Sequence, residues 1–104
     1  MSLELIAVIP PQTTAANTVI NTNKIKSPAC LSLIGVIGST YTINIQIPTT
    51  LNPDANTDSN WQNLYQEGAA VTLSSTNHVI AIPVGLSIRI VKPITANNVG
   101  VRLS

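Results

Sequence analysis

The sequence predicts an all-β fold: a single compact β-sandwich or small barrel of about seven or eight antiparallel strands, with one short helical turn. Three observations support this prediction. Ile, Val and Thr supply 35 of the 104 residues, and β-branched side chains fit pleated, half-buried surfaces better than helices. Short stretches of alternating apolar and polar residues recur at roughly ten-residue spacing and are separated by Pro, Gly and Asn. The length is that of one domain.

The stretch Val71–Pro93 contains the clearest strand. Leu86, Ile88 and Ile90 fall on one face of it and Ser87 and Arg89 on the other, which is the period of two expected for a half-buried strand. Two further strands precede it, at Ala69 to Leu73 and His78 to Ile82, and the short connection Pro83-Val84-Gly85 has the length of a hairpin turn. We therefore predict that these three strands form an antiparallel meander.

The other strands follow from the same patterns. Leu3 to Ile9 is an apolar strand that ends at Pro10-Pro11, and the polar stretch Gln12 to Asn23 is an extended arm, a weak edge strand or an ordinary loop. Ala29 to Ile37 is almost continuously apolar, which favours a buried strand. Alternating strands are predicted at Tyr41 to Ile47 and at Val99 to Leu103.

This division predicts an N-terminal strand and polar arm over residues 1–28 and a β-domain over 29–104. The isolated position of Leu3 to Ile9 suggests that it docks on its own sheet or on the edge of another subunit.

One segment departs from the strand pattern. Asp58 or Ser59 is a candidate cap for a short helix that contains Trp61, Leu64 and Tyr65 and stops at Gly68. The three apolar side chains have i, i+3, i+4 spacing, so such a helix would lay them over the sheet as a lid.

Charge and cysteine content exclude several classes of protein. The net charge is +1, with five basic and four acidic residues, whereas nucleic-acid-binding proteins carry a clustered basic face. No apolar run approaches the roughly 18 residues of a membrane helix, and the N-terminus lacks the pattern of a signal peptide. Cys30 is the only cysteine, so folding needs no intrachain disulfide. We expect neither a nucleic-acid partner nor a membrane, and synthesis in a cytosol.

The segment Asp54–Asn60 resembles the first half of a calcium loop, with oxygen-bearing side chains at alternate positions. The match then fails, because Ser59 stands where the loop needs Gly and Tyr65 where it needs Glu. The alternative is a polar turn whose Asp and Asn side chains bind their own backbone. We expect no cofactor and no metal.

No catalytic pattern is present. His78 has no second His or Cys beside it to form a zinc pair, and no nucleophile elbow accompanies it. Cys30 lies in the most apolar run and is expected to pack as a small hydrophobic residue. The sequence thus predicts a protein that is not an enzyme.

Two groups of residues are candidates for contact with a ligand or partner. Trp61 and Tyr65 are a possible stacking platform for a sugar, or else fill the edge of the core. Arg89 and Arg102 lie on the polar faces of their strands and Lys92 ends the first of these strands. These three cations either form a solvated sheet face or contact a partner protein, because Arg is enriched at interfaces.

The C-terminal part of the chain resembles small β-structured virion proteins of tailed bacteriophages, of the type that decorates capsids or forms head fibres. The resemblance covers roughly residues 40 to 104 and rests on an ordered series of segments: Trp61-Gln62-Asn63-Leu64, Ala70-Val71-Thr72-Leu73, residues 77–82, residues 85–93 and Val99-Gly100-Val101. It implies a structural role as a capsid decoration (cement) protein on the exterior of the virion, often as a homotrimer bound to the major capsid protein. The alternative is a glycan- or receptor-binding module of a phage fibre or tail tip.

Overall fold

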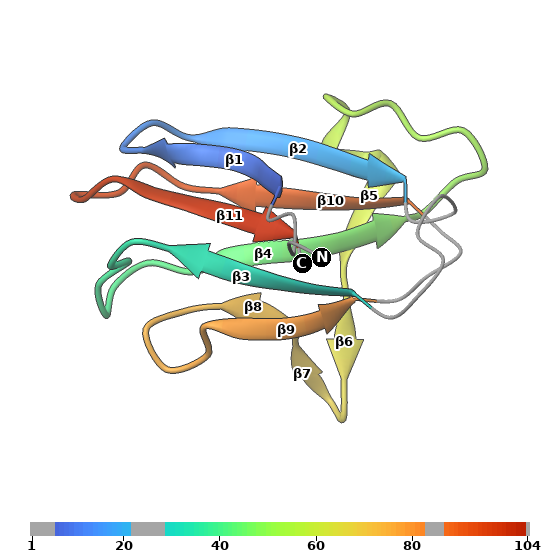
Figure 1. Ribbon diagram of the computed structural model, residues 1–104. Helices are drawn as coiled ribbons and strands as arrows, with labels where there is room; N and C mark the ends of the chain where they lie inside the picture. The colour runs from blue at the N-terminus through green and yellow to red at the C-terminus, as the bar shows by residue number, and fades with distance from the viewer. Residues whose placement is uncertain (1–5, 22–28, 83–86, 104) are drawn as a thin grey trace, which may run out of the picture.

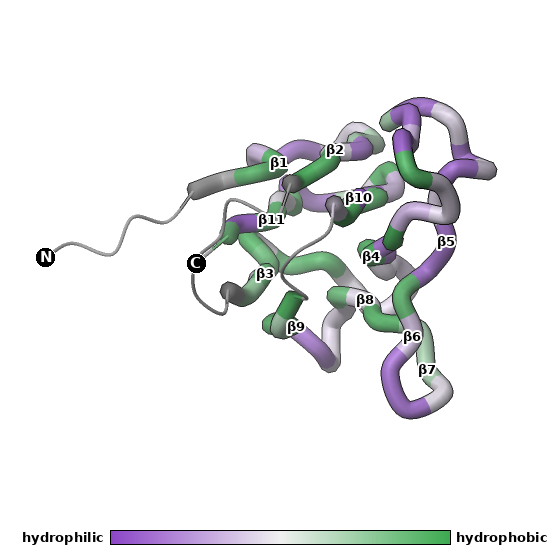
Figure 2. The backbone as a smooth tube through the Cα atoms, turned by 90° about the vertical axis from the view of Figure 1, so that its right-hand side faces the viewer, coloured by the Kyte–Doolittle hydropathy of each residue, from purple (hydrophilic) through white to green (hydrophobic). Residues whose placement is uncertain are grey.

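The computed structural model describes residues 6–21, 29–82 and 87–103, and these form two antiparallel sheets stacked face to face. The first sheet has the strand order β1-β11-β3-β9, with bounds β1 Ile6–Gln12, β11 Val99–Leu103, β3 Ala29–Ile34 and β9 Val79–Ile82. The second has the order β2-β10-β4-β5, with β8 also paired to β4, and bounds β2 Ala16–Asn21, β10 Ser87–Lys92, β4 Ile43–Pro48, β5 Trp61–Asn63 and β8 Thr72–Leu73. Figures 1 and 2 show the two layers, and they confirm the predicted all-β sandwich.

The chain crosses between the two sheets at four turns, so that consecutive strands lie opposite one another rather than side by side. The pairs β1–β2, β10–β11, β3–β4 and β8–β9 each form an arch of this kind. The eight strands joined by the arches follow the order β1-β11-β3-β9 in one sheet and β2-β10-β4-β8 in the other, with β5 as an additional partner of β4. This is the strand arrangement of a jelly roll.

The predicted meander is wrong. Strand β9 pairs with β3, β10 lies between β2 and β4, and β8 pairs with β4, so the three strands of Val71–Pro93 are not neighbours. The connection Pro83-Val84-Gly85 lies outside the described residues. Alternation separated the two faces of each of these strands, but a hairpin and an arch both bury the same face, and only the partner strands distinguish the two connections.

The N-terminal strands are part of the sandwich rather than a separate arm. Strand β1 pairs with β11 and β2 pairs with β10 along its whole length. Ile9 of β1 is among the most deeply buried side chains. Strand β1 also runs through Pro10-Pro11 instead of ending there, because it is an edge strand with two register shifts, where proline is tolerated. Of the three alternatives for Gln12 to Asn23, the edge strand is confirmed over residues 16–21, because β2 lies at the edge of the second sheet.

The core between the sheets is aliphatic, in a chain that has no Phe, one Trp and two Tyr. Its buried side chains are contributed by both sheets: Ile9, Leu31, Ile37, Ile43, Ile45, Leu73, Ile80, Ile82, Ile88, Ile90, Val99 and Val101. The alternation read from the sequence of β10 and β11 is confirmed, since Ile88, Ile90, Val99 and Val101 all face this core.

The predicted helix through Trp61, Leu64 and Tyr65 is wrong. A 3-10 turn, Asp58–Asn60, is followed directly by strand β5. Beyond Leu64 the chain leaves the sheet as a small hairpin, β6 Tyr65–Gln66 and β7 Ala69–Ala70, and then returns to the edge of β4 as β8. Glu67 and Gly68 have positive φ angles of 53° and 80°, as a two-residue hairpin turn requires. Gly68 is thus a turn residue, not a helix stop.

Candidate functional site

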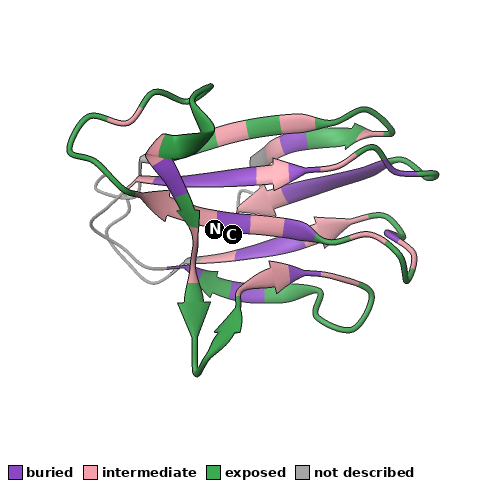
Figure 3. Ribbon diagram, turned by 180° about the vertical axis from the view of Figure 1, so that it is seen from behind, coloured by how far each residue is buried: buried purple, intermediate pink, exposed green. Residues whose placement is uncertain are grey.

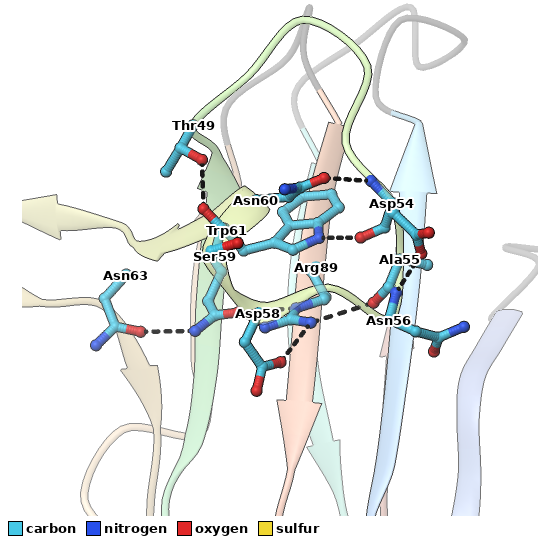
Figure 4. A network of polar contacts seen from close by, with 11 residues as sticks. Thr49, Asp54, Ala55, Asn56, Asp58, Ser59, Asn60, Trp61, Asn63 and Arg89 are labelled. Atoms are coloured by element: carbon cyan, nitrogen blue, oxygen red, sulfur yellow. Dashed lines mark hydrogen bonds and ion pairs between the residues drawn. The ribbon is translucent and has the colours of Figure 1, made fainter.

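A polar network covers the outer face of the second sheet, centred on Arg89 (Figure 4). Arg89 lies between Ile88 and Ile90 on β10, so its side chain points away from the core. Yet it is only 2% exposed, because the connection between β4 and β5 folds over it. Its Nε and Nη2 donate to Gln46 Oε1 at 2.8 and 2.6 Å, and its Nη1 donates to the Ala55 carbonyl and to Asp58 Oδ1, both at 3.1 Å.

Trp61 completes the cover over this cation. The centre of its ring lies 5.5 Å from the guanidinium carbon of Arg89, within the range of a cation–π contact, and its Nε1 donates to the Asp54 carbonyl at 2.9 Å. Trp61 is 5% exposed, whereas Tyr65, on the hairpin, is 62% exposed. The two aromatic residues proposed as a stacking platform are therefore in different environments, and Trp61 has almost no ring surface for a sugar.

The Asp54–Asn60 segment forms the polar turn that was the alternative to a calcium loop. Asp54 Oδ1 accepts the Asn56 N–H at 2.9 Å, and Asn60 Oδ1 accepts the Asp54 N–H at 2.8 Å. The Asp58 carboxylate binds Arg89. These side chains hold the loop closed over β10, and within the described ranges no three His, Cys, Asp or Glu residues gather as metal ligands.

Lys92 is buried as well, at 1% exposure. Lys92 lies two and four residues after Ile90 and Ile88, so its side chain is on the same core-facing side of β10, at the end of the sandwich. Its ammonium donates to the Thr14 carbonyl at 2.7 Å, to the Pro93 carbonyl at 3.0 Å and to Thr95 Oγ1 at 3.1 Å. Its three N–H groups are thus matched by three acceptors, and they join the β1–β2 turn to the β10–β11 connection.

The expected solvated face is consequently wrong for Arg89 and Lys92, whose polar atoms are taken up inside the chain. Arg102 differs: its Nε donates to Ser32 Oγ at 2.9 Å on the outer face of the first sheet, and the side chain stays partly exposed. Of the three cations predicted to contact a partner, only Arg102 has appreciable surface to offer one. The strand pattern missed the burial of Arg89 because it shows which face of the sheet a side chain occupies, not whether a loop covers that face. Lys92 differs, because it lies on the same face of β10 as Ile88 and Ile90.

His78 and Cys30 have ordinary environments. The exposed His78 ring lies 2.8 Å from the Ser75 carbonyl, within the tight turn that links β8 to β9. Cys30 is only partly buried, because it lies on the outer face of β3, opposite Ala81 of β9. The expectation that Cys30 packs inside the core is therefore not met.

The four arches meet at one end of the sandwich, on the left in Figure 1. We call this the arch end and define it by the connections 13–15, 35–42, 74–78 and 93–98. These connections contain no Asp, Glu, Lys or Arg. Val36 and Ile94 are 72% and 70% exposed there, on loops that the Asn97 side chain joins by donating to the Val36 carbonyl at 3.2 Å.

The arch end is a surface that sequence reasoning did not identify. Each uncharged connection was visible in the sequence, but their gathering at one end depends on the arch topology. Uncharged surface with exposed aliphatic side chains is typical of the centre of a protein interface.

Comparisons with protein-family models, with curated proteins and with solved structures gave no match to this chain. Within residues 6–21, 29–82 and 87–103, no helix has the length and apolarity needed to cross a membrane.

Burial of Lys92 gives a testable pH dependence. Desolvation lowers the pKa of Lys92 below its usual 10.5. Between this lowered pKa and 10.5, the unfolded chain holds the proton more tightly than the folded chain does, so the free energy of unfolding rises with pH across that window. Urea unfolding of the wild type and of Lys92→Met, at several pH values up to 10.5, measures the effect. The wild-type value minus that of Lys92→Met should increase with pH, and a constant or falling difference contradicts the assignment.

Proposed function

We propose that the protein is a non-enzymatic virion structural protein that decorates and stabilises a bacteriophage capsid, on the capsid exterior. The observation that carries the proposal is the arch end, an uncharged surface with two prominent aliphatic side chains, Val36 and Ile94. Such a surface suits contact with another protein, here the major capsid protein. The jelly-roll arrangement is compatible with this role, since it occurs in viral capsid domains and lectins, but fold alone does not determine function.

The low net charge agrees with a permanent place in an assembly, because a weakly charged surface gives little protection against association. A homo-oligomer, with a trimer favoured, belongs to the same proposal. Light scattering after size-exclusion chromatography measures the oligomer number.

The glycan- or receptor-binding alternative is less well supported. It relied on Trp61 and Tyr65 acting together, and Trp61 is instead occupied by Arg89 and the Asp54 carbonyl.

Two substitutions at the arch end test the proposal. In Val36→Asp and Ile94→Asp, a charge is placed on an exposed side chain, so the free energy of unfolding should change by no more than about 0.5 kcal/mol. Binding to empty capsids, measured by co-sedimentation, should fall at least about tenfold, because an aspartate buried at an interface loses its hydration. The capsids for this test are those of the phage that encodes this chain, identified from the genes that surround its own gene.

Leu51→Asp is the matched control. Leu51 is also an exposed aliphatic side chain, but it lies in the β4–β5 connection, at the opposite end of the sandwich. It should leave capsid binding unchanged. A wild-type protein that ignores capsids, or a gene that lies beside tail-fibre genes, would overturn the proposal.

A further inference from the structure

A cleft of about 710 Å³ lies between the projecting β6–β7 hairpin and strand β9. The hairpin extends beyond the body of the sandwich and is exposed throughout (Figure 3). Residues 69–71 of the hairpin and 79–81 of β9 line the cleft, together with Gln66, Glu67 and Asn77. This volume is within the roughly 300–1,000 Å³ range of ligand-binding clefts.

The β9 side of the cleft is a strand edge. Val79, Ile80 and Ala81 all line it, although successive side chains of a strand point to opposite faces. Three consecutive residues can share one wall only if their backbone faces it. Strand β9 is the last strand of its sheet and pairs with β3 alone in the described part of the chain.

The hydrogen-bond pattern identifies which backbone groups face the cleft. The Leu33 N–H donates to the His78 carbonyl at 3.0 Å, and Leu31 stands opposite Ile80. Bonding alternates along an antiparallel pair, so His78 and Ile80 turn their N–H and C=O groups toward β3. Val79 and Ala81 therefore turn theirs toward the cleft.

Strand β9 is short, with four residues, but three other features that block strand addition are absent from it. Its residues, Val79–Ile82, include no charge and no proline, and their register with β3 is regular. Strand β1, at the other edge of the same sheet, has two register shifts and contains Pro10-Pro11. An open, apolar edge is a template for pairing with another chain.

The hairpin side determines what fits beside β9. Ala69, Ala70 and Val71 are small, and no aromatic side chain is among the described residues that line the cleft, which disfavours a sugar. Glu67, at the hairpin turn, is the one acidic residue of this lining. The wall thus suits an extended segment with small or β-branched side chains and a Lys or Arg near Glu67.

We infer that the cleft accepts an extended peptide segment of a partner protein, which adds to the edge of β9 as a fifth strand of the first sheet. The backbone groups of Val79 and Ala81 bind the peptide main chain, and the hairpin packs against its side chains. The inference rests on β9 and the hairpin, not on the arch end, and it is independent of a virion role.

The test uses a displayed library of random twelve-residue peptides, selected on the wild-type protein alone, and the selected peptides are then measured on Ala81→Pro. Proline at residue 81 removes the N–H that faces the cleft and leaves the bonds to β3 in place. Enriched peptides should alternate β-branched residues and contain a Lys or Arg. The best peptide, titrated against labelled protein, should shift the amide resonances of Val79, Ala81 and Ala70. Its Kd should rise about tenfold or more in Ala81→Pro.

Ala81→Ser is the matched control, because it keeps the N–H and should bind as the wild type does. A second measurement leaves the protein unaltered and changes the peptide. Two versions of the peptide are made, one N-methylated at its odd-numbered amides and the other at its even-numbered amides, so that each lacks the N–H donors of one edge. The version that lacks the donors facing β9 should not bind, whereas the other should. The inference is overturned if selection enriches no peptide, if Ala81→Pro or both N-methylated peptides bind as well as their parents, or if the shifted amides lie elsewhere. It is also overturned if maltohexaose, and no peptide, shifts the β9 amides.

Discussion

Replacing Gly100 with alanine is expected to lower the free energy of unfolding by about 2–3 kcal/mol, since it overpacks a site that cannot relax. A Cβ at Gly100 would overlap the Ile9 carbonyl oxygen and would lie 2.8 Å from the Pro11 nitrogen and 2.9 Å from the Pro10 carbonyl carbon. All three are backbone atoms of β1, which cannot move away without breaking the Ile9–Val101 and Gln12–Val99 pairings. The lost docking of β1 outweighs the small entropic gain that alanine normally brings.

Urea unfolding followed by Trp61 fluorescence measures this change. Arg102→Ala is the control, because it lies two residues further along the same face of β11 and already has a Cβ. It removes the hydrogen bond to Ser32 and should cost no more than about 1 kcal/mol. If Gly100→Ala is as stable as the wild type, β1 does not pass over Gly100 in solution.

Replacing Arg89 with methionine is expected to cost about 2–3 kcal/mol and to loosen the β4–β5 connection. Methionine keeps most of the apolar packing but removes four hydrogen bonds, to Gln46, Ala55 and Asp58. Hydrogen bonds from a charged donor contribute more than neutral ones. Gln46 Oε1 would lose both donors from Arg89 while partly buried, although Nε2 keeps its hydrogen bond to Asn63. The Trp61 emission of the folded protein should move to longer wavelength as water reaches the ring.

Asp58→Asn separates the role of the hydrogen bonds from that of the ion pair. The Asp58 side chain is almost fully exposed, and such ion pairs contribute little. We therefore expect Asp58→Asn to cost less than about 0.5 kcal/mol. A loss equal to that of Arg89→Met would show that the ion pair, not the contacts to Gln46 and Ala55, holds the loop.

Gly100 permits β1 to pair at one edge of the first sheet, whose opposite edge is strand β9. At the arch end, the ammonium of Lys92 is taken up by Thr14, Pro93 and Thr95. The arch connections themselves contain no charged residue and expose Val36 and Ile94. A surface of this kind is expected to bind by excluding water rather than by attracting charge.

Local patterns in the sequence were sufficient for the fold class and for the buried faces. Alternation placed Ile88, Ile90, Val99 and Val101 toward the core, because the period of two in a strand is a property of its backbone alone. The turn at Asp54–Asn60 was also among the predicted alternatives, since its hydrogen bonds join residues close in sequence. The same alternation places Lys92 on the core face, because it lies two residues after Ile90 in the strand.

Only the tertiary structure decided which strands pair and what covers each face. The arches, the burial of Arg89 under the β4–β5 connection and the joining of Lys92 to Thr14 all link residues far apart in the chain. The hairpin after Leu64 replaced a predicted helix because β5 and β8 bond to the edge of β4 on either side of it, and that edge is not encoded locally. The arch end and the β9 cleft exist only once these distant segments meet, so no local pattern indicated them.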